Sequence, residues 1–134
     1  MATIKSYSDL QQSKKLTEIL PLESADMHLQ DASKEYENPY GIYDRNFRLV
    51  AGNSSKIINN KRDFRKGFIL PAWSLSVLLS VIRETIGYTL YGVNNVYMSC
   101  DLGDKPWKLE TEVYDNEVDA CVEMIIRLHE LNLL

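Results

Sequence analysis

The sequence predicts an α+β fold, in which an antiparallel sheet of three to five strands carries two or three helices, packed mainly on one face. Two observations predict this class. Apolar residues recur at helical spacing in segments 71–86 and 116–134, and they alternate with polar residues between positions 96 and 113. Such alternation is typical of antiparallel strands that have one face on a core and the other in water. The length of 134 residues fits a single domain spanning 1–134.

The first helix is expected near the start of the chain. Ser8 and Gln11 stand three residues apart in the form of a capping box, which places the helix start at Ser8. Pro21 is expected to end this helix, because proline cannot continue the hydrogen-bond ladder. Segment 22–41 is then predicted to be a loop with a short strand. Segment 42–50 is rich in β-forming residues and is predicted to be a strand or a loose hairpin.

The middle of the chain concentrates positive charge. Segment 45–67 contains seven basic residues and one acidic residue, whereas the whole chain has a net charge of −4. Its later part, about 51–67, is predicted to be a basic loop or insertion, with an extra strand around 56–59 as the alternative. Aromatic residues lie among the charges, as they do on surfaces that bind single-stranded nucleic acid: Phe47, Phe64 and Phe68. In that interpretation the candidate binding residues are Lys61, Arg62, Arg65 and Lys66.

The clearest predicted helix follows Pro71-Ala72-Trp73. One face of it is apolar, at positions spaced as i, i+3, i+4, i+7 and i+11: Leu75, Leu78, Leu79, Ile82 and Ile86. Ser74 is expected to cap the helix with its side-chain oxygen. Trp73 precedes the cap and is expected to pack on the helix as a hydrophobic staple. A tryptophan is also a typical binding hot spot, so Trp73 is a candidate interaction residue.

Three short strands are expected next, at 88–91, 96–100 and 107–113, joined by turn-rich segments. Their alternation predicts which side chains point at the helices: Met98, Cys100, Leu109 and Val113. It also predicts which side chains face water: Ser99, Glu110 and Glu112.

The last helix is predicted from Asn116 to about the C-terminus. Asn116 is a good capping residue, and Glu117 and Asp119 place negative charge at the positive end of the helix dipole. Apolar residues form one stripe along the helix: Val118, Cys121, Val122, Ile125 and Leu128. Glu123 lies on the polar side and has no evident structural purpose, so it is a second candidate interaction residue.

Three stretches of the chain carry a resemblance to known sequences. They are Pro71-Ala72-Trp73-Ser74-Leu75 with Leu78-Leu79, the stretch from Tyr114-Asp115-Asn116 to Met124-Ile125-Ile126, and the stretch from Gln12-Ser13-Lys14 to Ala25-Asp26-Met27. Together they resemble a family of small hypothetical proteins carried by phages, prophages and other mobile elements of gut bacteria. The matching stretches cover less than half of the chain. The resemblance implies a gene context and a cytoplasmic setting, and it implies no reaction.

No catalytic, cofactor-binding or metal-binding residues are predicted. His28 and His129 do not combine with Cys100 or Cys121 at the spacing of a metal site. Cys121 and His129 lie on one predicted helix, eight residues apart, which is about 12 Å along its axis. Proton transfer needs a much shorter distance. The cysteines are therefore expected to be free thiols of the core, with a disulfide between them as the alternative.

The chain is expected to be cytoplasmic and without a membrane association. Its first twenty residues mix charged and apolar side chains, unlike a signal peptide. The longest apolar stretch, 68–82, is too short to span a bilayer.

These observations leave three functional hypotheses. The leading one is a non-enzymatic accessory protein of a mobile element that interacts with an unidentified protein, or with a second copy of itself in a homodimer. The alternative is a nucleic-acid-associated accessory protein that uses segment 45–67. That alternative is disfavoured because the rest of the chain is strongly acidic. The third hypothesis is a small enzyme of unknown reaction.

Overall fold

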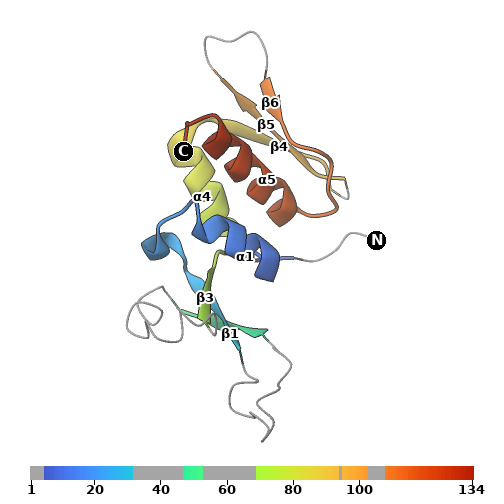
Figure 1. Ribbon diagram of the computed structural model, residues 1–134. Coiled ribbons are helices and arrows are strands. Elements are labelled where there is room, and N and C mark those ends of the chain that lie inside the picture. Colours follow the sequence, from blue (N-terminus) through green and yellow to red (C-terminus); the bar gives the residue numbers. More distant parts are fainter. Residues whose placement is uncertain (1–4, 32–46, 53–68, 94, 103–107) are drawn as a thin grey trace, which may run out of the picture. The chain divides into compact units, whose positions relative to one another are not determined.

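The computed structural model describes residues 5–31, 47–52, 69–93, 95–102 and 108–134 (Figure 1). Within these ranges the chain forms three α-helices, one short 3-10 helix and six strands. The strands form two antiparallel sheets of three strands each. The predicted α+β class, with three-stranded antiparallel sheets and helices, is confirmed, and the chain builds two such sheets.

The chain divides into two compact units. The N-terminal unit is Asp9–Trp73, and the C-terminal unit is Met1–Ser8 together with Ser74–Leu134. The predicted basic loop at about 51–67 lies outside the described residues from position 53 onward. A single domain over the whole chain stays a prediction.

The N-terminal unit begins with helix α1, Leu10–Thr17. Asp9 caps it: its carboxylate accepts a hydrogen bond from the Gln12 backbone at 2.9 Å, and the Gln12 side chain accepts one from the Asp9 backbone at 3.0 Å. The capping box therefore starts one residue later than the prediction of Ser8. The sequence contains two overlapping pairs of this form, and Ser8 is fully buried in the structure.

Helix α1 also ends before the expected stop at Pro21. Its last residue is Thr17, and Pro21 precedes the 3-10 helix η1, Leu22–Ser24. Proline suits that place, because its fixed φ agrees with the extended backbone that precedes a helix and its missing N–H is not needed there.

Three strands complete the N-terminal unit. They are β1, Met27–Asp31, β2, Phe47–Ala51, and β3, Ile69–Ala72, in the order β2-β1-β3. Pro71 lies on β3, an edge strand of this sheet, where a residue without an N–H is tolerated. Helix α1 packs on β3. Among the described residues of this unit, the buried apolar ones are Leu16, Leu20, Ala25, Leu29, Ile69, Ala72 and Trp73.

The C-terminal unit contains the two longer helices, α4, Leu75–Thr85, and α5, Glu117–Glu130. The predicted caps are confirmed. The Ser74 hydroxyl accepts from the Val77 backbone at 3.4 Å, and the Asn116 side chain accepts from the Asp119 backbone at 2.9 Å. The helices pack against each other (Figure 1). The predicted apolar stripe of α5 is buried, and Ala120 and Met124 are buried beside it.

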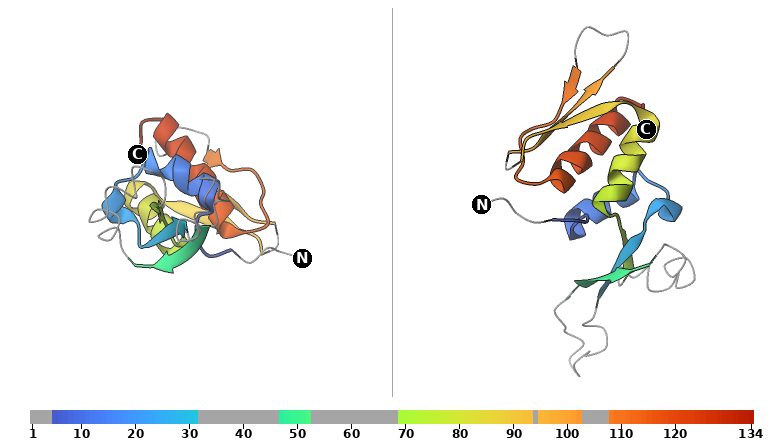
Figure 2. Two further views of the ribbon diagram at one scale, coloured as in Figure 1. Left: turned by 60° about the horizontal axis from the view of Figure 1, so that its bottom comes forward. Right: turned by 180° about the vertical axis from the view of Figure 1, so that it is seen from behind.

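The second sheet contains β4, Tyr88–Tyr91, β5, Tyr97–Asp101, and β6, Lys108–Glu110, in the order β4-β5-β6. Helix α5 packs on the central strand β5, so one face of this sheet lies on the helix, as Figure 2 shows from behind. The turn between β4 and β5 requires Gly92. Its φ is +90°, and a Cβ there would lie 1.9 Å from the Asn95 carbonyl oxygen.

The predicted alternation of this sheet is confirmed in part. Met98, Cys100 and Leu109 are buried toward the helices, and Glu110 and Glu112 are exposed. The prediction that Val113 points at the helices is wrong, because 59% of its surface is exposed. The prediction that Ser99 faces water is also wrong, because only 4% of its surface is exposed.

A β-bulge explains why Val113 is exposed. Cys100 lies opposite Leu109, but further along the strands Val96 pairs with Tyr114, so the chain after β6 has one residue more than its partner. Because side chains alternate with a period of two, one extra residue moves Val113 to the other face. Thr111 occupies this region, and its hydroxyl accepts a hydrogen bond from the Met98 backbone at 2.9 Å.

The position of Ser99 in the sheet explains its burial. Ser99 lies on the face away from the helices, as the alternation predicts, but it lies on the central strand. Its cross-strand neighbours are Thr89 and Glu110. A short side chain on the central strand, with a neighbouring strand on each side, is therefore buried although it points away from the helices.

Candidate functional site

The candidate site is the face of the β4-β5-β6 sheet that points away from helix α5, here called the outer face. Because side chains alternate along each strand, the residues that do not point at the helices share this face. They are Thr89, Tyr91, Tyr97, Ser99, Asp101, Lys108 and Glu110. Most of them are exposed, in contrast to Met98, Cys100 and Leu109 on the opposite face.

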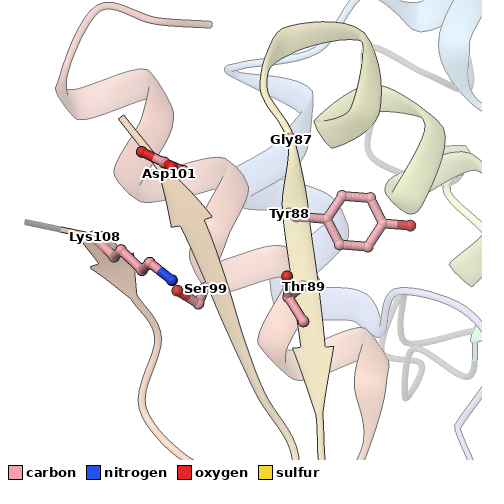
Figure 3. Close-up of a pocket in the computed structure, with 6 residues that line it drawn as sticks. All are labelled: Gly87, Tyr88, Thr89, Ser99, Asp101 and Lys108. Atoms are coloured by element: carbon pink, nitrogen blue, oxygen red, sulfur yellow. The ribbon is translucent and has the colours of Figure 1, made fainter. Parts of the chain in front are cut away.

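One end of the outer face forms a shallow hollow of about 340 Å³. Figure 3 shows Thr89, Ser99, Asp101 and Lys108 along it, with the Lys108 side chain running toward the Ser99 hydroxyl. Asp101 and Lys108 are direct cross-strand partners. The ring of Tyr88 turns away from these side chains, as its position opposite Cys100 requires. The hollow therefore offers hydroxyl groups, one carboxylate and one amine, which suit hydrogen bonding to a polar ligand.

The other end of the outer face is aromatic. Tyr91 and Tyr97 are cross-strand partners, and their rings are stacked with centroids 4.8 Å apart and planes at 15°. Tyr91 is 38% exposed, and Val93, just beyond it in the turn, is 82% exposed. Stacked tyrosines at a surface combine a large apolar area with hydroxyl groups, a combination that is enriched in protein interfaces.

A row of polar residues on α5 holds the chain next to this face. They follow one another at intervals of four, so they lie on one side of the helix. Arg127 donates to the Glu110 carbonyl, and the Glu123 carboxylate accepts from the Glu112 backbone at 2.8 Å. Asp119 forms an ion pair with Lys5 at 2.7 Å. The bonds of Arg127 and Glu123 hold the backbone of β6 and the bulge, and thereby the strand position from which the Glu110 side chain projects onto the outer face.

Glu123 also bonds the Tyr114 hydroxyl. Burial raises the pKa of Tyr114 above its ordinary value of 10.0, and the charge of Glu123 and this hydrogen bond raise it further. The phenol therefore stays protonated, and its hydroxyl group donates a hydrogen bond to the Glu123 carboxylate. Glu123, which the sequence leaves without a purpose, thus has a structural one, while a role in binding stays a prediction.

Trp73, the other candidate named from the sequence, is fully buried. Its indole N–H donates to the Ser24 hydroxyl at 2.9 Å, and that hydroxyl donates to the Pro21 carbonyl at 2.6 Å. Burial with a satisfied indole N–H favours a structural role for Trp73. The four basic candidates, Lys61, Arg62, Arg65 and Lys66, lie outside the described residues.

The two cysteines are free and buried, and the expected core thiols are confirmed. Burial raises the pKa of the Cys100 thiol from 9.0 to about 11. Burial raises that of Cys121 to about 12, with smaller contributions from the charges of Glu117 and Cys100. Both thiols are therefore protonated at neutral pH, and a protonated thiol is a poor nucleophile.

The described residues include neither a candidate metal site nor a helix that could span a membrane. They contain no group of three or more histidine, cysteine or acidic side chains placed to hold a metal ion. In the same ranges no helix combines the length and the apolar character that crossing a bilayer requires.

The tyrosine pair is not among the site residues predicted from the sequence. The signal was present, because the alternation in 88–91 and 96–100 already places Tyr91 and Tyr97 on the face away from the core. Large aromatic residues on the water face of two neighbouring strands are candidates for binding. Their stacking also requires that Tyr91 lie directly opposite Tyr97. That register depends on the length and shape of the turn at Gly92, which the sequence alone does not determine.

No protein-family model matches the chain, and no curated protein and no solved structure matches it.

Proposed function

We propose that this chain is a non-enzymatic protein-interaction module that binds its partner through the outer face of the β4-β5-β6 sheet. The observation that carries the proposal is the stacked Tyr91–Tyr97 pair, of which Tyr91 is exposed, on the same face as a polar hollow. Aromatic area combined with hydrogen-bonding groups is the usual composition of a protein interface. The hydrogen bonds from α5 to β6 and the bulge make the surface rigid before a partner arrives, which lowers the entropic cost of binding.

The chemistry of the groups favours binding over catalysis. The two thiols are protonated at neutral pH because burial raises their pKa values. The hollow combines hydroxyl groups with the cross-strand pair Asp101 and Lys108. A carboxylate and an amine side by side offer an acceptor and a donor, which suits recognition of a polar partner.

The biological setting in this proposal is that of a cytoplasmic accessory protein of a phage, prophage or other mobile element. It rests on the resemblance of three stretches of the sequence alone. The partner is a second protein, and a homodimer through the same face is one form that the interaction can take.

The proposal is tested with Tyr91→Ala in a pull-down from cells that carry the gene. The exposed Glu130→Ala is the matched control, since it changes the end of α5 and not the outer face. The expected result is a partner held by the parent protein and by Glu130→Ala but lost with Tyr91→Ala, at unchanged melting temperature. A partner held equally by all three proteins contradicts binding at the outer face.

A further inference from the structure

We infer that the partner presents an extended, arginine-containing segment to the outer face, with an arginine side chain stacked on the Tyr91–Tyr97 pair and paired with Glu110. This inference rests on the proposed function, because it names the chemistry of the partner for the same surface. Three features carry it: the stacked rings, the position of Glu110 beside them, and the charge of the C-terminal unit.

The tyrosine pair suits a guanidinium group. The two rings are stacked with their planes at 15° and their centroids 4.8 Å apart, so each ring has one face that the other ring does not cover, and Tyr91 is 38% exposed. Arginine has a planar, delocalised and weakly hydrated cation that stacks on aromatic rings. The ammonium group of lysine is compact and strongly hydrated, so it gains less from the same surface. The geometry therefore selects arginine over lysine.

Glu110 supplies the negative charge for this cation. It lies directly opposite Ser99, and Tyr97 is two residues from Ser99 on the same strand, so Glu110 and Tyr97 are diagonal neighbours on the outer face. Diagonal neighbours in a sheet are about 7–8 Å apart. One guanidinium group can therefore lie on the Tyr97 ring and donate hydrogen bonds to the Glu110 carboxylate. Arg127 holds the Glu110 carbonyl and so fixes this position of the strand.

The spacing along β5 suits an extended segment. Tyr97, Ser99 and Asp101 follow one another on the outer face at intervals of about 7 Å, which is also the spacing of alternate residues in an extended peptide. A segment that lies along β5 then places one side chain on the tyrosine pair and the next over Ser99. A third side chain of the segment reaches the hollow beside Asp101 and Lys108, where a polar group can bond both an acceptor and a donor.

The charge of the unit favours a basic partner. Met1–Ser8 and Ser74–Leu134 together contain five basic and ten acidic residues. A negative field of this kind attracts a cationic segment and repels phosphate groups. The same field disfavours nucleic acid as the ligand of this face, in spite of its stacked aromatic rings.

The test uses the full chain and three fluorescent peptides of alternating sequence, with threonine at every second position and arginine, lysine or glutamate between. Binding is measured by anisotropy at physiological salt. The arginine peptide is expected to bind about threefold or more tighter than the lysine peptide, from the size of an exposed cation–π contact. Tyr97→Ala, which removes the ring next to Glu110, and Glu110→Gln should each weaken binding of the arginine peptide by a similar factor. The exposed Glu84→Gln, which also removes one negative charge, should not weaken it.

Equal binding of the arginine and lysine peptides, or equal binding of the arginine peptide by the parent and by Tyr97→Ala, overturns the inference. Tighter binding of single-stranded DNA than of the arginine peptide, lost with Tyr91→Ala, also overturns it. A partner that is lost from Tyr91→Ala in the pull-down, while no peptide binds, leaves the outer face as the interface and rejects arginine recognition. The two proposals can therefore fail separately.

Discussion

Asn116 and Ser74 both cap helices of the C-terminal unit, but they are bonded differently. The Asn116 oxygen accepts from the Asp119 backbone at 2.9 Å, and its amide donates to the Asp115 and Asp119 carboxylates. The Ser74 oxygen accepts from Val77 at the longer distance of 3.4 Å. Asn116 is also buried, so its loss leaves polar groups away from water.

The difference predicts unequal costs of losing the two caps. Asn116→Ala is expected to lower the free energy of unfolding by about 2 kcal/mol and Ser74→Ala by about 0.5–1 kcal/mol, within the usual range for helix caps. Urea denaturation of both variants and the parent measures this. Equal costs, or a larger cost at Ser74, would contradict the account of how the caps are bonded.

The buried thiols predict a dependence of stability on pH. The pKa of a cysteine is ordinarily 9.0, whereas in the folded chain that of Cys100 is about 11 and that of Cys121 about 12. Below about pH 8 both thiols are protonated whether the chain is folded or not, so they do not change stability. Above pH 9 the unfolded chain loses these protons first, so the free energy of unfolding falls as pH rises.

The loss is at most about 1.4 kcal/mol per pH unit for each thiol. The parent is therefore expected to lose stability more steeply between pH 9 and 11 than the double variant Cys100→Ala/Cys121→Ala. Other groups titrate in the same range, but they do so in both proteins. Parallel curves of stability against pH would show that the thiols ionise as readily in the folded chain as in the unfolded one.

At the scale of elements, the bulge after β6 determines which side chains at that edge of the second sheet point at the helices. Thr111 is buried, and its hydroxyl accepts from the Met98 backbone while it donates to the Glu112 carbonyl. Thr111→Val keeps the shape of the side chain but leaves the buried Met98 N–H without this acceptor. The expected cost is about 1–3 kcal/mol in the free energy of unfolding.

Thermal and urea unfolding of Thr111→Val measure that cost. The exposed Val113→Thr is a suitable control, since it exchanges the same two residue types in the same segment and should change stability little. Unchanged stability of Thr111→Val would mean that the hydroxyl does not support the bulge.

The elements differ in how far the sequence predicts them. The caps at Ser74 and Asn116 and the buried stripe of α5 follow from local side-chain chemistry and helical spacing, and these predictions are confirmed. The orientation of Val113 could not be predicted, because a bulge depends on pairing with a distant strand. The start of α1 was ambiguous, since Ser8 and Asp9 both match the capping pattern.

The same limit applies to the candidate site. Alternation alone places Tyr91 and Tyr97 on the water face, but their stacking depends on the register of β4 and β5. The bonds from Glu123 to Glu112 and Tyr114 join a helix to a bulge, so no sequence pattern reveals them. Glu123 therefore looked like a surface residue free to bind a partner.

At the scale of the whole molecule, charge is distributed unevenly along the chain. Segment 45–67 has seven basic residues and one acidic residue, whereas the C-terminal unit has twice as many acidic as basic residues. The basic segment is expected to be solvated and not to bind single-stranded DNA tightly at physiological salt, because the rest of the chain repels phosphate.

Titration of labelled single-stranded DNA at low and physiological salt measures the affinity of the chain for DNA. Binding to phosphates weakens steeply as salt rises, because each neutralised phosphate releases counterions. Micromolar, salt-sensitive binding that is abolished by changing Lys61, Arg62, Arg65 and Lys66 to serine would favour the nucleic-acid alternative over a protein partner.

The central claim is that the partner binds on the outer face of the β4-β5-β6 sheet, and photo-crosslinking tests it most directly. A photo-reactive amino acid is placed singly at exposed positions of that face, Thr89, Tyr91 and Lys108, and at the exposed helical positions Glu84 and Glu130. After irradiation in cells that carry the gene, the account predicts one discrete crosslinked product from the three outer-face positions and none from the two helical ones. Crosslinks confined to Glu84 or Glu130, or equal yields at all five positions, would contradict it.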